Sequence, residues 1–422
     1  MEVRRGYKQT ELGLTPEDWE VKSTNEIGNP VRGGSPRPAG DARYFDGSYI
    51  PWLTVAALTN IPASQLVVSE TATCLTEEGS LHSRTLTPGT LIIANSGATL
   101  GVAKILGIKC CANDGIAALL NLSKSVSPRY LAYFINTKTT YLREIVATGN
   151  GQPNLNTELI GNFRFVLPPT KVEQEAVADV LTDADALIES LEQVLVKKRQ
   201  LKQGAMQELL TGRKCLPGFN EEWKQKRLGD TAILKARIGW QGLTTAEYLD
   251  SGDYYLVTGT EFKDGYIDWS HCHYVDESRY KQDRNIQLKQ HDVLVTKDGT
   301  IGKVALATHL AGPATLNSGV FVIRPLEGAF HPEFFYHLLC SNAFTEFLSQ
   351  LSAGSTINHL YQKDFVNFIY RTPATIREQV EIADVLSDMD AEVVALQAKL
   401  ATIRALKQGM MQELLTGRIR LI

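Results

Sequence analysis

The sequence Leu201-Lys-Gln-Gly-Ala-Met-Gln-Glu-Leu-Leu-Thr-Gly-Arg213 occurs twice in this chain of 422 residues. It returns as Leu406-Lys-Gln-Gly-Met-Met-Gln-Glu-Leu-Leu-Thr-Gly-Arg418, in which twelve of the thirteen residues are identical. The same offset of 205 aligns residues 171–213 with residues 376–418 without a gap. A period of about half the chain indicates one duplication rather than a solenoid of short repeats.

The regions that precede these segments repeat more loosely. Gly97-Ala-Thr-Leu-Gly101 resembles Asp298-Gly-Thr-Ile-Gly302, and Asn113-Asp-Gly115 resembles Asn317-Ser-Gly319. Variable and near-identical parts therefore alternate along the chain, and its length fits two to four domains. The predicted organisation is a first variable domain (1–170), a central helical repeat (171–213), a second variable domain (214–375) and a C-terminal helical repeat (376–422).

Each near-identical segment predicts one long helix. Thr170 and Thr375 are candidate N-caps with Glu three residues on, and Gly212 and Gly417 are candidate C-terminal stops. About 40 helical residues would form a rod of roughly 60 Å. The apolar residues that step by three or four are Val177, Val180, Ala184, Leu187, Leu191, Val194, Leu201 and Ala205, and then Ile382, Val385, Met389, Leu396, Ile403, Leu406 and Met410. Two further sets widen these faces, namely Leu181, Ile188 and Leu195, and Leu386, Val393 and Leu400.

Each apolar stripe must be buried, and the simplest partner of one helix is the other, packed antiparallel about a pseudo-two-fold axis. We expect Asp183, Asp185, Asp388 and Asp390 to lie on solvated faces. A scaffold needs only its core residues, yet exposed positions also match between the two copies. A repeated docking surface for two copies of one partner explains that identity better.

The variable domains predict an α+β architecture. Short apolar runs bounded by turn residues indicate strands at 49–54, 90–94, 292–296 and 320–324. One helix is expected to follow in each domain, at 128–147 and 332–351.

Composition excludes several classes of protein. The chain is 43% hydrophobic and 21% charged, which is ordinary for a globular protein, and no run reaches the roughly 18 apolar residues of a membrane span. Six cysteines without a CxxC motif favour a reducing, cytoplasmic location. The net charge of −4 lacks the basic excess typical of nucleic-acid binders.

Catalytic and cofactor motifs are missing. We find no Walker loop, HExxH, GxSxG or GxGxxG fingerprint. The Asn/Asp-Pro-Pro-aromatic tetrapeptide of amino-methyltransferases is also missing, since Val166-Leu167 precedes Pro168-Pro169. His271-Cys272-His273 is the one tempting metal cluster, but a single such pair without further ligands is more often incidental. We predict no catalytic residues and no bound metal.

Both variable domains carry loops rich in Gly, Ser, Asn and basic residues. Asn and Gln suit adenine edges, whereas Arg and Lys suit guanine and phosphate. Taken singly, such loops are more often plain turns, but their occurrence in both domains favours binding. The candidate DNA-binding residues of the first domain are Arg32, Arg37, Arg43, Tyr44, Asn95, Ser96, Thr99, Asn150, Gln152 and Asn154. Those of the second domain are Lys235, Arg237, Trp240, Gln241, Lys297, Thr300, Ser355, Thr356 and Asn358.

These features together resemble the specificity subunit of a Type I restriction-modification system. Gly33-Gly-Ser-Pro36, Ile50-Pro-Trp52 and Ala94-Asn-Ser-Gly-Ala-Thr-Leu-Gly101 resemble one target recognition domain. Asp292-Val-Leu-Val-Thr-Lys-Asp-Gly-Thr-Ile-Gly302 and Gly354-Ser-Thr-Ile-Asn358 resemble a second. Leu167-Pro-Pro-Thr-Lys-Val-Glu-Gln174 and its helix resemble the family's central repeat region. Asp253-Tyr-Tyr-Leu256 stands where the second domain lacks a clear Ile-Pro-Trp.

The resemblance implies an α+β fold in which two long antiparallel helices separate two recognition domains, each reading half of a split site on double-stranded DNA. It implies that the helices set the spacer and dock two methyltransferase subunits, which restriction subunits join. The chain would bind no cofactor itself, because S-adenosylmethionine belongs to the methyltransferase. Since the net charge of −4 differs from that of a typical DNA binder, we expect phosphate contacts to be shared with that partner. Two alternatives are a self-contained DNA methyltransferase and a coiled-coil adaptor without nucleic acid.

Overall fold

A computed structural model describes residues 5–147, 153–239, 242–352 and 359–421 and separates into two compact units. Unit 1 comprises the chain up to Val194 together with the chain from Leu396, and unit 2 comprises Leu195–Ala395. Each unit thus holds one variable domain and parts of both long helices. The linear segments that we predicted at 171–213 and 376–422 are shared between the two units.

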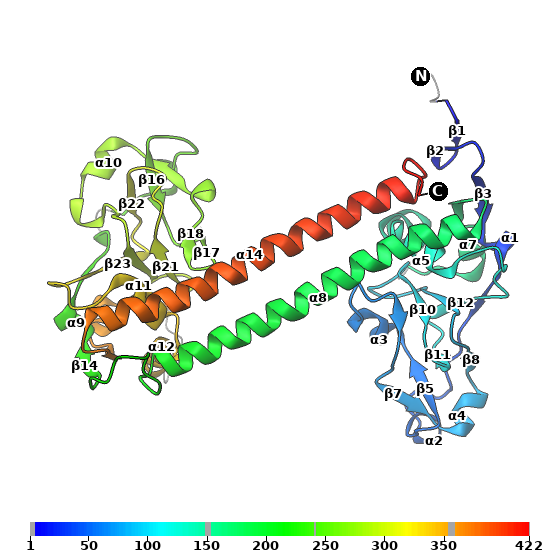
Figure 1. The fold of residues 1–422 in the computed structure, drawn as a ribbon, viewed down its shortest axis with the longest axis horizontal. Coiled ribbons are helices and arrows are strands. Elements are labelled where there is room, and N and C mark those ends of the chain that lie inside the picture. The colour runs from blue at the N-terminus through cyan, green and yellow to red at the C-terminus, as the bar shows by residue number, and fades with distance from the viewer. Residues whose placement is uncertain (1–4, 148–152, 240–241, 353–358, 422) are drawn as a thin grey trace. The chain divides into compact units, whose positions relative to one another are not determined.

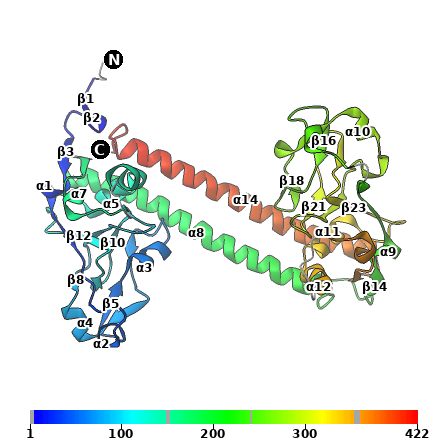
Figure 2. The same cartoon turned by 180° about the vertical axis from the view of Figure 1, so that it is seen from behind.

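The two long helices are confirmed. Helices α8 (Lys171–Leu209) and α14 (Ile376–Leu414) have 39 residues each and lie side by side in Figures 1 and 2. Thr170 Oγ1 accepts a hydrogen bond from the Glu173 backbone N–H at 3.2 Å, and Thr375 Oγ1 accepts one from Glu378 at 3.3 Å, as expected of N-caps.

Each helix is followed by a glycine of positive φ. Gly212 and Gly417 both have φ of +70°. Trp223 and Trp19 respectively lie against the position that a Cβ would take at these glycines. A left-handed backbone and a neighbouring indole ring both favour glycine at this stop.

Val177 and Leu191 of the predicted stripe of α8, and Ile382 of α14, are buried as expected, but much of the buried face lies one position beyond the stripe. Leu181, Ile188 and Leu195 are buried, whereas Leu187 and Leu201 are 43% and 50% exposed. In α14 Leu386 and Leu400 are buried, and Val385 and Leu406 are exposed. Residues that we assigned to widen the face therefore form its centre, and Leu187, Val194, Leu201, Val385 and Leu406 were wrongly placed in the seam.

Charged residues also lie between the helices, so the prediction that Asp185 and Asp390 are solvated is wrong. In unit 1 Lys407 Nζ donates to Asp185 Oδ1 at 2.5 Å, and in unit 2 Lys202 Nζ donates to Asp390 Oδ1. Asp185 is 4% exposed. The offset of 205 relates the two pairs, so the antiparallel packing contains one interaction twice, once in each unit.

Unit 1 contains two small sheets beside two strand pairs. A five-stranded sheet has the order β4-β12-β9-β10-β6, and a four-stranded sheet has the order β7-β5-β11-β8. Pair β1–β2 and pair β3–β13 are antiparallel. The strands are β1 (Tyr7–Thr10), β2 (Gly13–Pro16), β3 (Glu20–Ser23), β4 (Asn29–Arg32), β5 (Ile50–Leu53), β6 (Val67–Val68), β7 (Thr73–Leu75), β8 (Arg84–Leu86), β9 (Leu91–Ala94), β10 (Ala103–Leu106), β11 (Cys110–Ala112), β12 (Ile116–Leu120) and β13 (Arg164–Leu167).

The helices of unit 1 are short, except for the parts of α8 and α14. They are α1 (Thr24–Ile27), α2 (Ala42–Phe45), α3 (Val55–Asn60), α4 (Glu77–Leu81), α5 (Pro128–Asn136), α6 (Thr139–Tyr141), a π-helical turn (Leu142–Val146) and α7 (Thr157–Gly161). The Gln174 side chain joins α8 to the start of α5, because its Oε1 accepts from the Ser127 backbone N–H at 2.7 Å.

Unit 2 also contains two small sheets beside a strand pair, but the number of strands in each sheet differs from unit 1. A six-stranded sheet has the order β15-β23-β20-β21-β18-β17, a three-stranded sheet has the order β19-β16-β22, and β14 pairs with β24. The strands are β14 (Lys224–Arg227), β15 (Ala232–Lys235), β16 (Tyr254–Val257), β17 (Phe262–Lys263), β18 (Tyr266–Ile267), β19 (His273–Val275), β20 (Asp292–Thr296), β21 (Val304–Ala307), β22 (Ala314–Leu316), β23 (Val320–Pro325) and β24 (Ile369–Thr372). The helices and 3₁₀ turns are α9 (Leu228–Thr231), Thr245–Glu247, Trp269–His271, α10 (Glu277–Lys281), Arg284–Ile286, α11 (Pro332–Leu339), α12 (Asn342–Leu351) and α13 (Gln362–Phe365).

The four predicted strands are confirmed as β5, β9, β20 and β23, but each predicted single helix is broken. Asn136 ends α5, and its side chain bonds to Ala103 of β10 through both the amide oxygen (2.8 Å) and the amide nitrogen (3.0 Å). In unit 2 the break lies between α11 and α12, where Ser341 takes an extended backbone. The helical periodicity of apolar residues does not reveal such breaks, because the helices on both sides of the break keep an apolar face.

The predicted fold class is confirmed as two α+β domains with two long helices packed antiparallel. No helix among the described residues is long and apolar enough to span a membrane.

Candidate nucleic-acid interface

The polar loops of unit 1 meet at one edge of its sheets. Strand register places Arg32, at the end of β4, opposite Ala117, and Ala94, at the end of β9, opposite Ile116. The β5 end is joined to the same edge, because the Asn113 backbone N–H donates to the Leu53 carbonyl at 2.9 Å. Segments far apart in sequence therefore form one loop cluster.

Unit 2 holds its loops with the same backbone bonds. In unit 1 the Asn95 N–H donates to the Gly115 carbonyl (2.9 Å), and the Asn95 carbonyl accepts from Leu155 (2.8 Å). In unit 2 the Lys297 N–H donates to Gly319 (2.8 Å), and the Lys297 carbonyl accepts from Leu360 (2.8 Å). These bonds make Asn95 and Lys297 structural equivalents.

The same correspondence covers the strand that lacks Ile-Pro-Trp. Asn317 donates to Val257 of β16 at 2.8 Å, as Asn113 donates to Leu53 of β5. Tyr254-Tyr-Leu256 therefore stands where Ile50-Pro-Trp52 stands in unit 1. The two domains share a scaffold and differ in the side chains that it carries.

Several candidate residues of unit 1 lie together in the loop cluster. Arg32 and Arg37 are exposed and bind Asp114, and Ser96 forms a β-bridge with Asn154, which is also exposed. Asn95 is 1% exposed, and its amide donates to the Asp114 carbonyl at 3.2 Å. Thr99 lies in the same loop, 3.4 Å from Thr59 of α3 through their hydroxyl oxygens.

Arg43 and Tyr44 are not in this cluster. Both belong to α2, and the Arg43 carbonyl accepts from Thr76, directly after β7. Since β7 pairs with the start of β5, α2 lies at the opposite end of β5 from Leu53. Tyr44 is buried, and Arg43 is held by Asp41, whose hydrogen bond raises the pKa of Arg43.

In unit 2 the candidate residues divide between exposed and buried places. Lys235 and Thr300 are exposed, and Lys297 lies 5.2 Å from the Phe321 ring centre, with its pKa lowered by burial. Arg237 is 1% exposed and donates to the Leu316 carbonyl at 2.9 Å and to Thr315 Oγ1 at 3.3 Å. Burial lowers the pKa of Arg237, and these contacts hold the strand end that precedes the next loop.

The remaining candidates lie outside the described residues. They are Asn150, Gln152, Trp240, Gln241, Ser355, Thr356 and Asn358.

Three residues that our predictions did not include take part in the two loop clusters. Asp114 binds side chains from two other loops of unit 1, and Asp298 Oδ1 is bonded to His359 Nδ1 in unit 2. The repeated Asn113-Asp-Gly115 and Asn317-Ser-Gly319 motifs contained the signal for Asp114, because the middle residue differs between them.

The described residues contain no group of three or more His, Cys, Asp or Glu that could hold a metal. His271 bonds to Asp268 at 2.9 Å, and the His273 ring lies 5.4 Å from the Tyr248 ring.

Two grooves of similar size lie where the long helices end. The groove in unit 2 has a volume of about 640 Å³ between the end of α8 and the start of α12, and the groove in unit 1 has about 560 Å³ between the end of α14 and the end of α5. Six repeat-matched pairs of identical residues line both grooves, namely Gln203/Gln408, Met206/Met411, Gln207/Gln412, Leu210/Leu415, Thr211/Thr416 and Arg213/Arg418. The helix wall is thus the same in both grooves, whereas the opposite walls differ, with residues 340–343 and Glu346 in unit 2 and Leu12, Phe134 and Val166 among others in unit 1.

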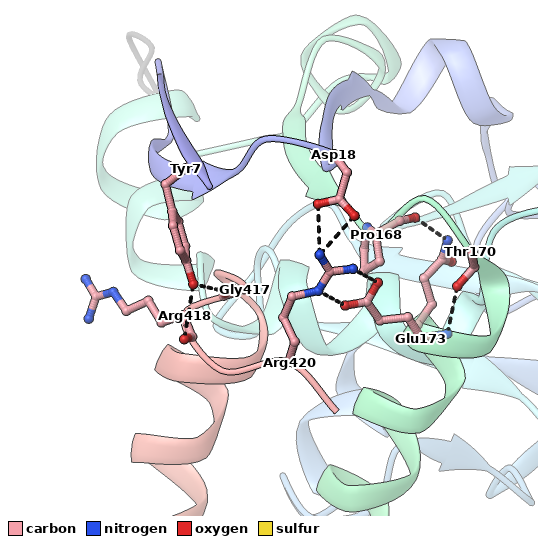
Figure 3. Close-up of polar contacts among 9 residues, drawn as sticks. Tyr7, Asp18, Pro168, Thr170, Glu173, Gly417, Arg418 and Arg420 are labelled. Carbon is pink, nitrogen blue, oxygen red and sulfur yellow. Dashed lines mark hydrogen bonds and ion pairs between the residues drawn. The ribbon is translucent and has the colours of Figure 1, made fainter. Parts of the chain in front are cut away.

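The C-terminal segment is bound to the rest of unit 1 through Arg420 (Figure 3). Its guanidinium donates to both Glu173 oxygens at 2.7 and 2.8 Å and to both Asp18 oxygens at 2.9 Å. The Tyr7 hydroxyl donates to the Gly417 carbonyl at 3.1 Å. Glu173, which stands at the capping-box position after Thr170, thus binds Arg420 with its carboxylate, whereas the offset of 205 places Cys215 at the position of unit 2 that corresponds to Arg420.

Comparison with known proteins identifies this architecture. The family model described as the Type I restriction modification DNA specificity domain matches residues 16–198 and 220–405. The specificity subunit of the Type I restriction enzyme MjaVIII from Methanocaldococcus jannaschii is 24% identical over 98% of this chain and 96% of its own length. The MjaIX specificity subunit of the same organism is also 24% identical with the same coverage.

Solved structures agree on the fold. The crystal structure of the Type I restriction-modification S subunit from M. genitalium superposes with a TM-score of 0.63 at 12% identity, over 98% of each chain. A chain from a structural study of complex assembly and conformational transition in the type I R-M system superposes with a TM-score of 0.55 at 16% identity, over 96% of this chain and 99% of that one.

Proposed function

This chain belongs to the Type I restriction-modification DNA specificity family and is a specificity subunit, and on that premise we propose that its two recognition domains read different halves of a split DNA site. The loop cluster of each unit is the reading surface. In unit 1 it presents Arg32, Arg37, Ser96 and Asn154, whose donors and acceptors suit base edges and phosphates.

One observation carries this proposal. The same backbone bonds hold both loop clusters, yet equivalent positions carry different side chains. Asn95 corresponds to Lys297, and Asp114 corresponds to Ser318. A duplicated scaffold with changed side chains is what two readers of two different sequences require, because base identity is read by side chains and not by the fold.

We extend the proposal to two methyltransferase subunits, one at each groove, joined by restriction subunits in the full complex. The two grooves are lined by six identical pairs, which supports one kind of partner bound twice. An unrelated function for each groove would not need Gln207 and Gln412, or Thr211 and Thr416, to match.

Native mass spectrometry of the chain with its methyltransferase tests this stoichiometry. We expect two copies on the parent chain, one copy on Met206→Arg or Met411→Arg, and none on the double variant. Two methyltransferase copies on the double variant would show that the grooves do not bind the methyltransferase.

We propose that the chain itself is not catalytic and binds no methyl donor. S-adenosylmethionine would bind the methyltransferase partner, and the whole complex would act on DNA in the cytoplasm. The support is the lack of catalytic and cofactor motifs in the sequence.

A selection of random DNA duplexes by gel shift, with and without the methyltransferase, tests the recognition role. We expect enrichment of one sequence made of two defined parts with a fixed gap between them. A coiled-coil adaptor would enrich nothing under either condition, and that result would overturn the proposal.

A further inference from the structure

Asp114 is the residue on which three loops of the first recognition domain converge. It lies in the turn between β11 and β12. Its carboxylate accepts a hydrogen bond from Ser35 Oγ at 2.7 Å and lies 3.4 Å from Arg37 Nη2. Its carbonyl accepts from Arg32 Nε at 2.5 Å and from the Asn95 amide at 3.2 Å. Side chains from the loops after β4 and β9 are thus bound by one residue.

The Asp114 side chain also fixes the orientation of its own peptide. Ser35 Oγ donates to the carboxylate and accepts from the Asp114 backbone N–H at 3.2 Å. This reciprocal pair holds the turn in place, and the turn carbonyl in turn orients Arg32 and Asn95. The loop after β4 also packs closely against this turn, because a Cβ at Gly33 would lie only 2.1 Å from the Asn113 carbonyl oxygen.

An acidic residue at a DNA-reading edge needs a reason, since its charge repels phosphate. Arg37 is 73% exposed and Asp114 is 40% exposed, so the pair is too open to contribute much to folding. What the pair can do is restrict the Arg37 side chain before DNA arrives. An arginine that is already ordered loses less conformational freedom when it binds, and its planar donors then meet a base edge in one orientation.

The second domain is not built this way. Ser318 takes the place of Asp114, and among the described residues its side chain makes no hydrogen bond to the neighbouring loops. There Asp298 bonds to His359 instead. The Asp114 arrangement therefore belongs to one reader only and is not a general requirement of the fold.

Resting on the proposed function, we infer that Asp114 is a positioning residue for the first half-site, which aims Arg32 and Arg37 at the DNA and fixes the buried Asn95 in its loop. It affects which bases are accepted without contacting them itself. Loss of its side chain frees Arg37 and loosens the turn that holds the other two.

The test is genome-wide mapping of methylated sites in cells that carry the complete complex. The variants are Asp114→Ala, which removes every side-chain contact, Asp114→Asn, which retains a hydrogen-bond acceptor for Ser35, and Ser35→Ala, which breaks the reciprocal pair. Glu70→Ala is the control, because it removes the same charge from an exposed position after β6, at the opposite end of the sheet from the loop cluster.

For Asp114→Ala we expect discrimination at one or two base pairs of the first half-site to fall by roughly 10- to 100-fold, with the second half-site unchanged. Ser35→Ala should relax the same positions, Asp114→Asn should be intermediate, and Glu70→Ala should match the parent. The melting temperature of the complex should stay at the parent value.

An unaltered first half-site in both Asp114→Ala and Ser35→Ala would overturn the inference. So would equal relaxation of both half-sites, or a general loss of methylation with a lowered melting temperature. Failure of the proposed function looks different, because the parent complex would then show no site made of two parts.

Discussion

Replacing Arg420 with alanine should destabilise unit 1 strongly, although Arg420 lies two residues from the end of the chain. Its guanidinium binds both oxygens of Glu173, whose side chain is only 2% exposed. Removing one partner of a buried pair costs about 3–5 kcal/mol, because the remaining charge is left without compensation. Arg420 is itself 34% exposed, so water can partly replace it and the lower end of that range applies. The contact to Asp18, which is 50% exposed, adds at most about 1 kcal/mol.

A loss of about 3 kcal/mol should lower the unfolding temperature of unit 1 by roughly 6–12 °C. Differential scanning calorimetry of the parent, Arg420→Ala and Arg418→Ala measures this. Arg418 is a matched control, since its ion pair with Glu413 is exposed on both sides.

The double variant Glu173→Gln with Arg420→Ala separates charge from packing. It should recover most of the lost stability, because glutamine leaves no buried charge. A shift for Arg420→Ala no larger than that of Arg418→Ala, or no recovery in the double variant, would refute this reasoning.

Three further predictions concern unit 2, the long helices and the methyl donor. Glu378 repeats Glu173 but has a buried oxygen without a partner, and burial raises its pKa. A raised folded-state pKa gives stability that is lost as pH rises through it. The unfolding temperature of Glu378→Gln, measured by calorimetry, should therefore rise relative to that of the parent between pH 4 and pH 8. Parallel curves of unfolding temperature against pH would contradict this. Inserting four residues after Lys198 and four after its repeat counterpart Ile403 lengthens both helices by about 6 Å, so the preferred gap between half-sites should grow by one or two base pairs in a methylation map. An unchanged gap with full activity would show that the helices do not set it. Isothermal titration of S-adenosylmethionine into the isolated chain should show no binding, and methyl transfer by that chain would exclude the non-catalytic role.

The long helices were predictable because their signals are local. Thr170 and Gly212 mark the ends of α8 by hydrogen-bonding and backbone preferences that need no tertiary information. The buried face was less predictable, since apolar spacing ignored the Asp185–Lys407 pair that lies inside the seam. Charged residues that find a partner across a helix interface shift that interface away from the purely apolar stripe.

The loop clusters show the limit of composition as a guide. Gly, Ser and basic residues identified the loops, but Arg37 and Arg237 have the same side chain and opposite environments. Arg237 is buried by bonds to Leu316 and Thr315 from β22, a strand distant in sequence. Such pairing depends on sheet order, which the sequence pattern does not specify. Asp114 was missed for the complementary reason, because an acidic residue is an unlikely choice for a DNA reader until its arginine partners are seen.

Each recognition domain should control its own half-site and no other. Methylated sites are mapped genome-wide for two complexes, one with Ser96→Ala and Asn154→Ala in unit 1, and one with Lys297→Ala and Thr300→Ala in unit 2. We expect the first to relax one half-site, by about 1–3 kcal/mol for each lost bidentate base contact, and the second to relax only the other half-site. Relaxation of both half-sites by either pair of substitutions would contradict separate readers.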